Sequence, residues 1–355
     1  MKPPKVLHIV SNASEFFHDY PFYHYLFKKN EFFESVIFNV VTVKKKNDKM
    51  PFPVFKYDAS SINEISEVIS NEKPDILHCH SIWLLEGALK ESEKYNIPMC
   101  FSFYRNTWSE VSKNLSKHKK TLSNTKNIFV PGRQIMEVLH GQEINVPMTI
   151  VKEVLDSTYV FKKAYSYKER PVMTFAVLIS EFNKDYINNV HTGLEKILMT
   201  GKELNVAWIC FEKDVQAAIE EDVKNRSLGK YVSIIDLKNF PLLEYEGLIA
   251  DGNKNQAYSL SQYLHLLFSC MSNGKFLIVK EEKGLEDILI NEVNCIVLPE
   301  YSSSKLGHLI HFFINFQDEM YKVMSDAMNF MEENHSLQTN MKKCVDSYIS
   351  FSSRE

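Results

Sequence analysis

The stretch GLIADGNKNQAYSLSQYLHLLFSCMSNGKFLIVKEEKGLEDILINEVNCIVL, residues 247–298, decides the fold class of the chain. Three short apolar runs in it have the length of buried strands: 247–250, 276–279 and 295–298. Ser259 stands where a helix N-cap belongs, and six residues follow it at helical spacing: Leu260, Tyr263, Leu264, Leu267, Phe268 and Met271. Gly274 then ends this helix. The alternation of strands and helices predicts a parallel sheet with crossover helices.

Two turns of this stretch are candidate anion sites. Loops at the carboxyl ends of parallel strands line a crevice, and helix N-termini there offer backbone N–H groups to anions. The turn before Ser259 and the turn at Gly284, which precedes a second predicted short helix, are therefore candidate positions for a phosphate-bearing ligand. Ordinary crossover loops have the same pattern, and the residues alone leave that alternative open.

The rest of the chain repeats the α/β alternation. Further strands are predicted at 5–10, 35–43, 76–80, 98–104, 127–130, 149–152, 172–179, 205–211 and 232–235. Helices are predicted over most of 16–33, at 62–69, 84–95, 134–140, 187–199 and 215–225, and from 305 onward. The polar segment 165–171 predicts a linker. The sequence thus predicts an N-terminal domain at 1–164 and a second domain at 172–330, with a C-terminal helix at 331–355 that crosses back to the first.

Composition excludes several classes of protein. The chain has 355 residues, of which 45% are hydrophobic and 24% charged, an ordinary globular balance with enough length for two domains. A net charge of −4 provides no global basic field for nucleic acid. Six scattered cysteines without a CxxC pair indicate reduced thiols. The polar start and the lack of a long apolar run argue against a signal peptide and a membrane span, so we expect a cytoplasmic protein.

Four segments carry a resemblance to a known family. They are CMSNGKFLIV (270–279), KGLEDIL (283–289), PDILHCHSIWLLEGALKESEKYNIPMCFSFY (74–104) and VPGRQIMEVL (130–139). In their order along the chain they resemble segments of the retaining GT-B glycosyltransferases of the family-four type. The resemblance implies an α/β GT-B architecture: two Rossmann-like domains facing an interdomain cleft, with the acceptor side in the first and the nucleotide sugar on the second.

The resemblance also assigns candidate site residues. On the donor side they are Lys184, Ser259, Leu260, Ser261 and Gly284. On the acceptor side they are Ser11, Asn12, His80 and Tyr104. The sequence departs from the family at four positions of the site. The family's glutamate pair falls on Ser261 and Ser269, its arginine on Leu178, its glycine-rich turn on residues 11–14, and its strand-end histidine on Tyr104.

The expected function is transfer of a hexosyl group from a nucleotide sugar to a saccharide, lipid-linked or protein acceptor. The resemblance implies no metal and no cofactor beyond the nucleotide sugar as co-substrate, and it leaves the catalytic residues unassigned. Because of the four departures, the alternative remains a non-catalytic GT-B homologue that acts as a glycan- or protein-binding partner of an active glycosyltransferase. A third hypothesis is that the protein is a nucleotide-sugar epimerase of the same fold.

Two further clusters of residues each have two possible interpretations. His78 and His80 alternate along a predicted strand and face the same way, so they could share a metal, although the sequence shows no third ligand. The alternative is a packed core histidine with His80 at the crevice. Lys113, Lys117 and Lys120 lie at helical spacing within 109–121. They predict peripheral contact with the anionic inner face of a membrane or, alternatively, a solvated helix face.

Overall fold

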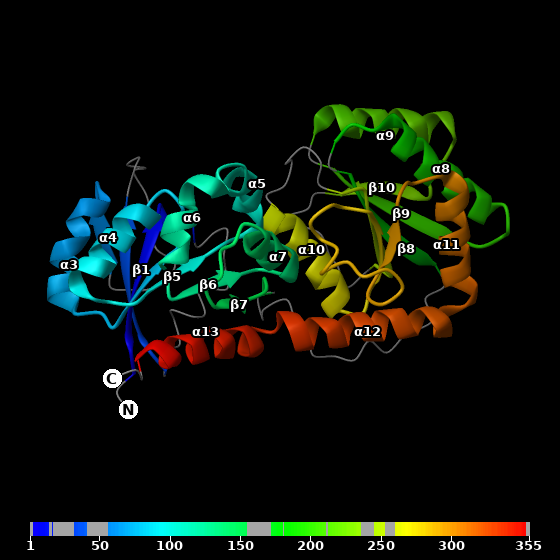
Figure 1. Cartoon of the computed structure of the whole chain (residues 1–355). Helices are drawn as coiled ribbons and strands as arrows, with labels where there is room; N and C mark the ends of the chain where they lie inside the picture. Colours follow the sequence, from blue (N-terminus) through cyan, green and yellow to red (C-terminus); the bar gives the residue numbers. More distant parts are fainter. Residues whose placement is uncertain are drawn as a thin grey trace. The chain divides into compact units, whose positions relative to one another are not determined.

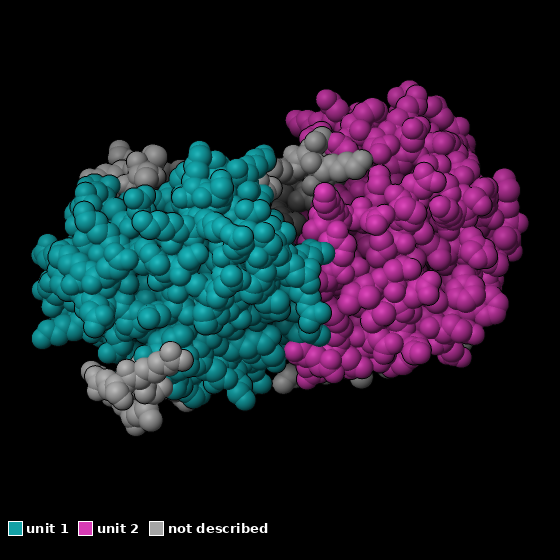
Figure 2. Space-filling view, viewed as in Figure 1, with its two compact units in different colours: residues 1–156, 334–355 teal, residues 157–333 magenta. Residues whose placement is uncertain are grey.

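The computed structural model describes residues 3–13, 16, 32–40, 56–154, 172–179, 181–210, 212–235, 245–252 and 260–352. The chain divides into two compact units, coloured separately in Figure 2. Unit 1 comprises Met1–Asp156 and Asn334–Glu355, and unit 2 comprises Ser157–Glu333. The described strands form one seven-stranded and one six-stranded parallel sheet (Figure 1), which confirms the prediction of two parallel α/β units. The predicted linker at 165–171 lies outside the described residues.

The sheet of unit 1 has the strand order β3-β2-β1-β4-β5-β6-β7. Its strands are β1 (Lys5–Ser11), β2 (Glu34–Val40), β3 (Lys56–Ala59), β4 (Ile76–Cys79), β5 (Met99–Ser102), β6 (Asn127–Val130) and β7 (Met148–Ile150). From β1 the chain adds strands to one side, and it then returns to place β4 on the other side of β1. The carboxyl ends of β1 and β4 therefore form the topological switch point, the position where ligands bind in open α/β sheets.

Helices cover both faces of this sheet because alternate residues of its strands point to opposite sides. On one face, Leu7 and Ile9 of β1 belong to a core with α3 (Ile65–Glu72), α4 (Leu85–Tyr95), α6 (Leu115–Ser123) and α7 (Arg133–Gly141). On the other face, Val6 and Val10 pack with Cys344 and Tyr348 of α13 (Leu337–Ser352). The described part of unit 1 also contains η1 (Ile62–Glu64) and α5 (Arg105–Lys113).

The sheet of unit 2 has the order β10-β9-β8-β11-β12-β13. Its strands are β8 (Met173–Leu178), β9 (Leu204–Ile209), β10 (Val232–Ile235), β11 (Gly247–Ala250), β12 (Phe276–Lys280) and β13 (Ile296–Leu298). The switch point of this sheet lies between β8 and β11. Gly247 allows β11 to lie close to its neighbours, because a Cβ there would come within 2.6 Å of the Phe276 backbone oxygen.

The helices of unit 2 include α10 (Leu260–Ser272), the helix that was predicted after Ser259. They are α8 (Lys184–Leu198), α9 (Lys213–Asn225), α10, α11 (Ser303–Asn315) and α12 (Gln317–His335), whose last two residues are assigned to unit 1. In α10 the residues predicted to form the apolar stripe are buried where the structure describes their side chains. Gly274 follows this helix with a φ of +60°, as the prediction of a glycine stop requires.

Three local predictions need correction. Strand β3 was not predicted, since its sequence KYDA has only weak strand character. The segment after Gly284 forms a series of turns instead of a short helix. The segment carrying the three lysines is two helices, because Asn114 has a φ of −115° and ends α5 before α6 begins. Lys113 is therefore on α5 while Lys117 and Lys120 are on α6, and all three are exposed.

Candidate functional sites at the carboxyl edges of the two sheets

The switch point of unit 1 brings together the predicted acceptor-side residues. Ser11 is the exposed last residue of β1, and Asn12 follows with a φ of +56°. The His80 backbone N–H donates to the Ile9 carbonyl at 2.9 Å, which places the end of β4 beside this turn. Tyr104 precedes α5, and its hydroxyl lies 2.6 Å from His80 Nδ1. Ser11, Asn12, His80 and Tyr104 thus lie at one edge of one sheet.

A third histidine joins His78 and His80. His8 of β1 is paired in register with His78 of β4, and its Nδ1 lies 3.0 Å from His80 Nε2. One ring nitrogen from each of the three residues lies within 4.8 Å of the others. Sequence reasoning missed His8 because it considered only His78 of β4 and His80, which directly follows that strand. The signal was present, since neighbouring parallel strands would align the two residues.

Hydrogen bonds hold the three imidazoles in the unit 1 core. The two ring nitrogens of His78 lie 2.5 Å from the Tyr348 hydroxyl of α13 and 2.7 Å from Ser102 Oγ of β5. Burial lowers the pKa of His78 to about 3. Burial, with the neighbouring imidazoles, lowers the pKa of His8 and of His80 well below its usual range. All three rings are therefore neutral at neutral pH.

An aromatic ring packs on this edge. The Phe16 ring lies 5.0 Å from the His80 ring and 6.0 Å from the Tyr104 ring, measured between centroids. His80 was expected to face a crevice, but its solvent exposure is 7%, so it is largely buried. The unit 1 edge is consequently aromatic, hydroxylated and uncharged at these positions.

The switch point of unit 2 has a different chemistry. Lys184 is the exposed first residue of α8, the helix that follows β8. The Asn183 side chain caps that helix by accepting from the Tyr186 backbone N–H at 3.0 Å. On the neighbouring strand, β11 ends at Ala250 and is followed by the buried Asp251. Parallel pairing of β8 and β11 places the amino end of α8 and the loop after β11 at the same edge.

The second helix terminus of this edge belongs to α10. Ser259 lies outside the described residues, while Leu260 and Ser261 are the first two residues of the helix. Ser269, at the position of the family's second glutamate, donates its hydroxyl to the His265 carbonyl at 2.7 Å. Gly284 has a φ of +93°, and its N–H donates to Glu286 Oε2 at 2.8 Å. A phosphate at Gly284 would have to displace that carboxylate, so the amino end of α10 is the better anion position.

Carboxylates and tyrosines that sequence reasoning missed lie at the same edge. Gly252 has a φ of +92°, and a Cβ on it would lie 3.6 Å from Glu282 Oε2, so Glu282 lies beside the loop after β11. Burial, together with the charge of Glu282, raises the pKa of Tyr263 well above its usual range. The Tyr301 hydroxyl donates to the Ala250 carbonyl at the end of β11. Tyr263 was recognised only as part of the apolar stripe, so its hydroxyl was not considered.

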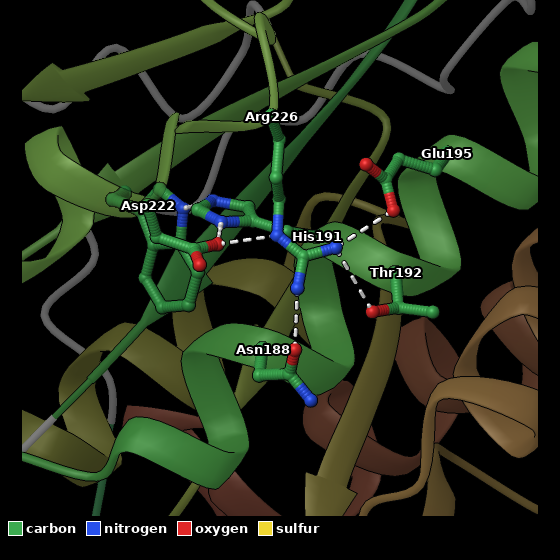
Figure 3. A network of polar contacts seen from close by, with 7 residues as sticks. Asn188, His191, Thr192, Glu195, Asp222 and Arg226 are labelled. Atoms are coloured by element: carbon green, nitrogen blue, oxygen red, sulfur yellow. Dashed lines mark hydrogen bonds and ion pairs between the residues drawn. The ribbon is translucent and has the colours of Figure 1, made fainter. Parts of the chain in front are cut away.

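A separate network in unit 2 joins α8 to α9. In Figure 3 the Arg226 guanidinium lies between Asp222 and three residues of α8: Asn188, Thr192 and Glu195. The His191 ring accepts from Trp208 Nε1–H at 3.0 Å and contacts Asp222 at 2.6 Å. Burial lowers the pKa of His191, and Asp222 opposes that shift. These residues stabilise the packing of α8, the helix that carries Lys184.

No protein-family model and no curated protein sequence matches the chain. Solved structures do match over its full length. A glycosyltransferase from Rickettsia africae aligns over 100% of both chains with 11% identity and a TM-score of 0.66. HepE of Anabaena, solved with UDP, aligns over 98% of this chain and 100% of its own with 11% identity and a TM-score of 0.66. The chain has the GT-B fold.

The GT-B fold is shared by enzymes of more than one reaction class. A protein from Listeria monocytogenes assigned as a UDP-N-acetylglucosamine 2-epimerase aligns over 100% of this chain and 98% of its own, with 14% identity and a TM-score of 0.57. At such identities the likeness establishes the fold, and function has to be argued from the site. None of the helices in the described part of the chain is long and apolar enough to cross a membrane.

Proposed function

We propose that the protein is a glycosyltransferase that transfers a sugar from a nucleotide sugar to a saccharide, lipid-linked or protein acceptor. The observation that carries the proposal is the full-length match to a GT-B structure solved with UDP. The chemistry of the two sheet edges supports it. Unit 2 offers a cation and helix amino ends at its switch point, and unit 1 offers uncharged hydroxyl and imidazole groups at its own.

The donor diphosphate binds at the unit 2 edge in this proposal. The positive ends of α8 and α10 and the ammonium group of Lys184 stabilise its negative charge. These groups would also stabilise the nucleotide that leaves during transfer, which is where electrostatic catalysis has a large effect. The carboxylates of Asp251 and Glu282 would accept hydrogen bonds from donor hydroxyls. Because Lys184 and the helix ends supply the positive charge, the donor site requires no divalent cation.

The acceptor binds at the unit 1 edge, near Ser11, Asn12, His80 and Tyr104. The non-catalytic alternative differs from the proposal in one measurable respect. A glycosyltransferase must bind a nucleotide sugar saturably, whereas a binding partner of another enzyme need not.

Titration calorimetry with UDP, GDP, dTDP, CMP and their sugars, in buffer containing EDTA, tests the proposal. We expect saturable binding of one nucleotide class, weakened about 10-fold or more by Lys184→Ala, since a charge-assisted contact contributes about 1.5–3 kcal/mol. Lys213→Ala is the matched control, because Lys213 is also the exposed first residue of a helix but follows β9, away from the switch point. Absence of binding at millimolar nucleotide would contradict the proposal and favour the non-catalytic alternative.

A further inference from the structure

The proposed function places the acceptor near His80 but gives no role to His8 and His78, which form a cluster of imidazoles with it. One ring nitrogen from each of the three residues lies within 4.8 Å of the others, and all three side chains are buried. His8 and His78 lie on the adjacent strands β1 and β4, and His80 directly follows β4. We propose that these three histidines bind one divalent transition metal ion of the zinc class. Such a site would fix the switch-point ends of β1 and β4 to each other.

The ring geometry is close to that of a three-histidine site. Zinc–nitrogen bonds of about 2.0–2.1 Å in a tetrahedron place ligand nitrogens about 3.3 Å apart and ring centroids about 5 Å apart. His8 Nδ1 and His80 Nε2 are 3.0 Å apart, and their ring centroids are 5.3 Å apart. The His8 and His78 centroids are 5.4 Å apart. Two of the three pairs therefore already have about the required separation of ring centroids.

The third pair defines the adjustment that binding requires. The His78 and His80 centroids are 3.9 Å apart, so these rings must separate by roughly 1 Å to share a tetrahedral ion. His78 must also exchange one of its hydrogen bonds, to Tyr348 or to Ser102, for the metal. The bond between His8 and His80 is replaced as both nitrogens turn to the ion.

The surroundings provide the outer partners that histidine ligands use. Ligating imidazoles are oriented by a hydrogen bond at their second nitrogen. His80 has this partner in the Tyr104 hydroxyl, 2.6 Å from its Nδ1, and His78 retains one of its two hydroxyl partners. Burial favours the neutral imidazole, which is the ligating form. A set of three nitrogens suits zinc, copper, nickel or cobalt, and it disfavours magnesium and calcium, which prefer oxygen ligands.

Cobalt substitution tests the proposal on the full chain without any measurement of activity. The protein is treated with EDTA, exchanged into buffer and titrated with Co²⁺, and the visible absorption of low-symmetry cobalt is followed. We expect saturation at one ion per chain, displacement of cobalt by an equimolar amount of Zn²⁺, and no displacement by Mg²⁺. Elemental analysis of the zinc-loaded protein checks the stoichiometry.

Variants locate the ion. His80→Asn and His8→Gln are each expected to weaken Zn²⁺ binding at least 10-fold, and Tyr104→Phe about 10-fold through the loss of the outer partner. The matched control is His191→Gln, which alters an equally buried histidine in unit 2 and should leave binding unchanged. The proposal is overturned if the folded wild-type protein shows no cobalt spectrum, or if binding persists unchanged in both His80→Asn and His8→Gln. The nucleotide titration is independent of this result, since it is performed in EDTA.

Discussion

The two sheets have the same doubly wound topology, yet their switch points present opposite chemistry. At the unit 1 edge the side chains are imidazoles and a phenol, with an aromatic ring packed on them. At the unit 2 edge, Lys184 and Asp251 follow the switch-point strands, and Glu282 lies beside the same loop. The topology therefore fixes where a ligand can bind, and the side chains after each strand decide its charge. The side chains at the unit 1 edge are uncharged, whereas those at the unit 2 edge carry charges of both signs.

Of the substitutions that would separate the two units, Gly247→Ala is expected to have the largest effect on stability. The new Cβ would come within 2.6 Å of both the Phe276 backbone oxygen and the Phe175 ring, so β11 must move. Overpacking of this kind costs about 2 to 3 kcal/mol. Because Asp251 follows β11 directly, the unit 2 edge should be distorted while unit 1 is not. Thermal unfolding monitored by calorimetry measures the loss of stability.

Gly141→Ala is the control for that substitution. Gly141 ends α7 in unit 1, and a Cβ there would meet nothing within 4 Å. We expect an unchanged or slightly higher Tm, since alanine favours the helix. A Gly247→Ala protein as stable as wild type would show that β11 is not held as tightly as its contacts indicate.

The stability of the two units should depend differently on pH. Burial, with the nearby charges of Lys152, Arg105 and Lys343, lowers the pKa of His335 to about 3, and the hydrogen bond to the Glu153 carbonyl opposes that shift. Its Nδ1–H donates to the Glu153 carbonyl at 2.6 Å. The folded pKa lies below the unfolded value of about 6.5, so the stabilisation is complete above pH 6.5 and is lost as the pH falls toward 3. The loss is about 1.4 kcal/mol per pH unit.

The free energy of unfolding at pH 7 and pH 5 measures this difference. His335→Gln should reduce the pH-dependent loss by about 2 kcal/mol relative to wild type. His191→Gln should reduce it less, because Asp222 beside His191 raises the pKa that burial lowers. A larger reduction in His191→Gln than in His335→Gln would contradict the assignment.

The smallest expected effect is that of Arg226→Lys. Lysine retains the charge but cannot contact Asp222 on α9 and Asn188, Thr192 and Glu195 on α8 together. We expect a loss of about 1 kcal/mol in the stability of unit 2, since the site is partly exposed. Denaturant titration measures it, with Arg133→Lys at an exposed position of unit 1 as the control. Equal stability of the two variants would show that the network contributes little.

The sequence predicted the architecture because apolar periodicity reports burial directly. Strands β6, β10 and β11 have the predicted bounds, and α10 buries the predicted stripe wherever its side chains are described. The predictions failed where this periodicity is short or weak, as in strand β3 and in the turns after Gly284, and where a single polar residue decides the structure. Asn114 breaks the helix that was expected to carry three lysines, and the local pattern gave no sign of that break.

The candidate sites were only partly predictable for a related reason. His8 lies beside His78 because β1 and β4 are neighbours in the sheet. The order of strands in a sheet cannot be deduced from a local sequence pattern. The helix predicted after Ser259 begins at Leu260, as α10 does, because local sequence specifies helix termini. Lys184 was assigned by resemblance, and α8 begins there, three residues before the predicted helix start. Glu282 and Tyr301 could not be assigned from sequence, because their contacts join segments on different strands and helices. The interdomain cleft and the role of Ser259 remain predictions.

The return of the chain to unit 1 has a consequence for biosynthesis. Unit 2 is an insertion between Asp156 and Asn334, and α13, which contributes Cys344 and Tyr348 to the unit 1 core, is translated after all of it. At about 5–20 residues per second, unit 1 waits roughly 10 to 35 s on the ribosome for its last helix. By the end of that interval every described strand of the unit 2 sheet has been translated, whereas one apolar face of the first sheet still lacks α13. The unit that is translated second should therefore be the first to reach its native state.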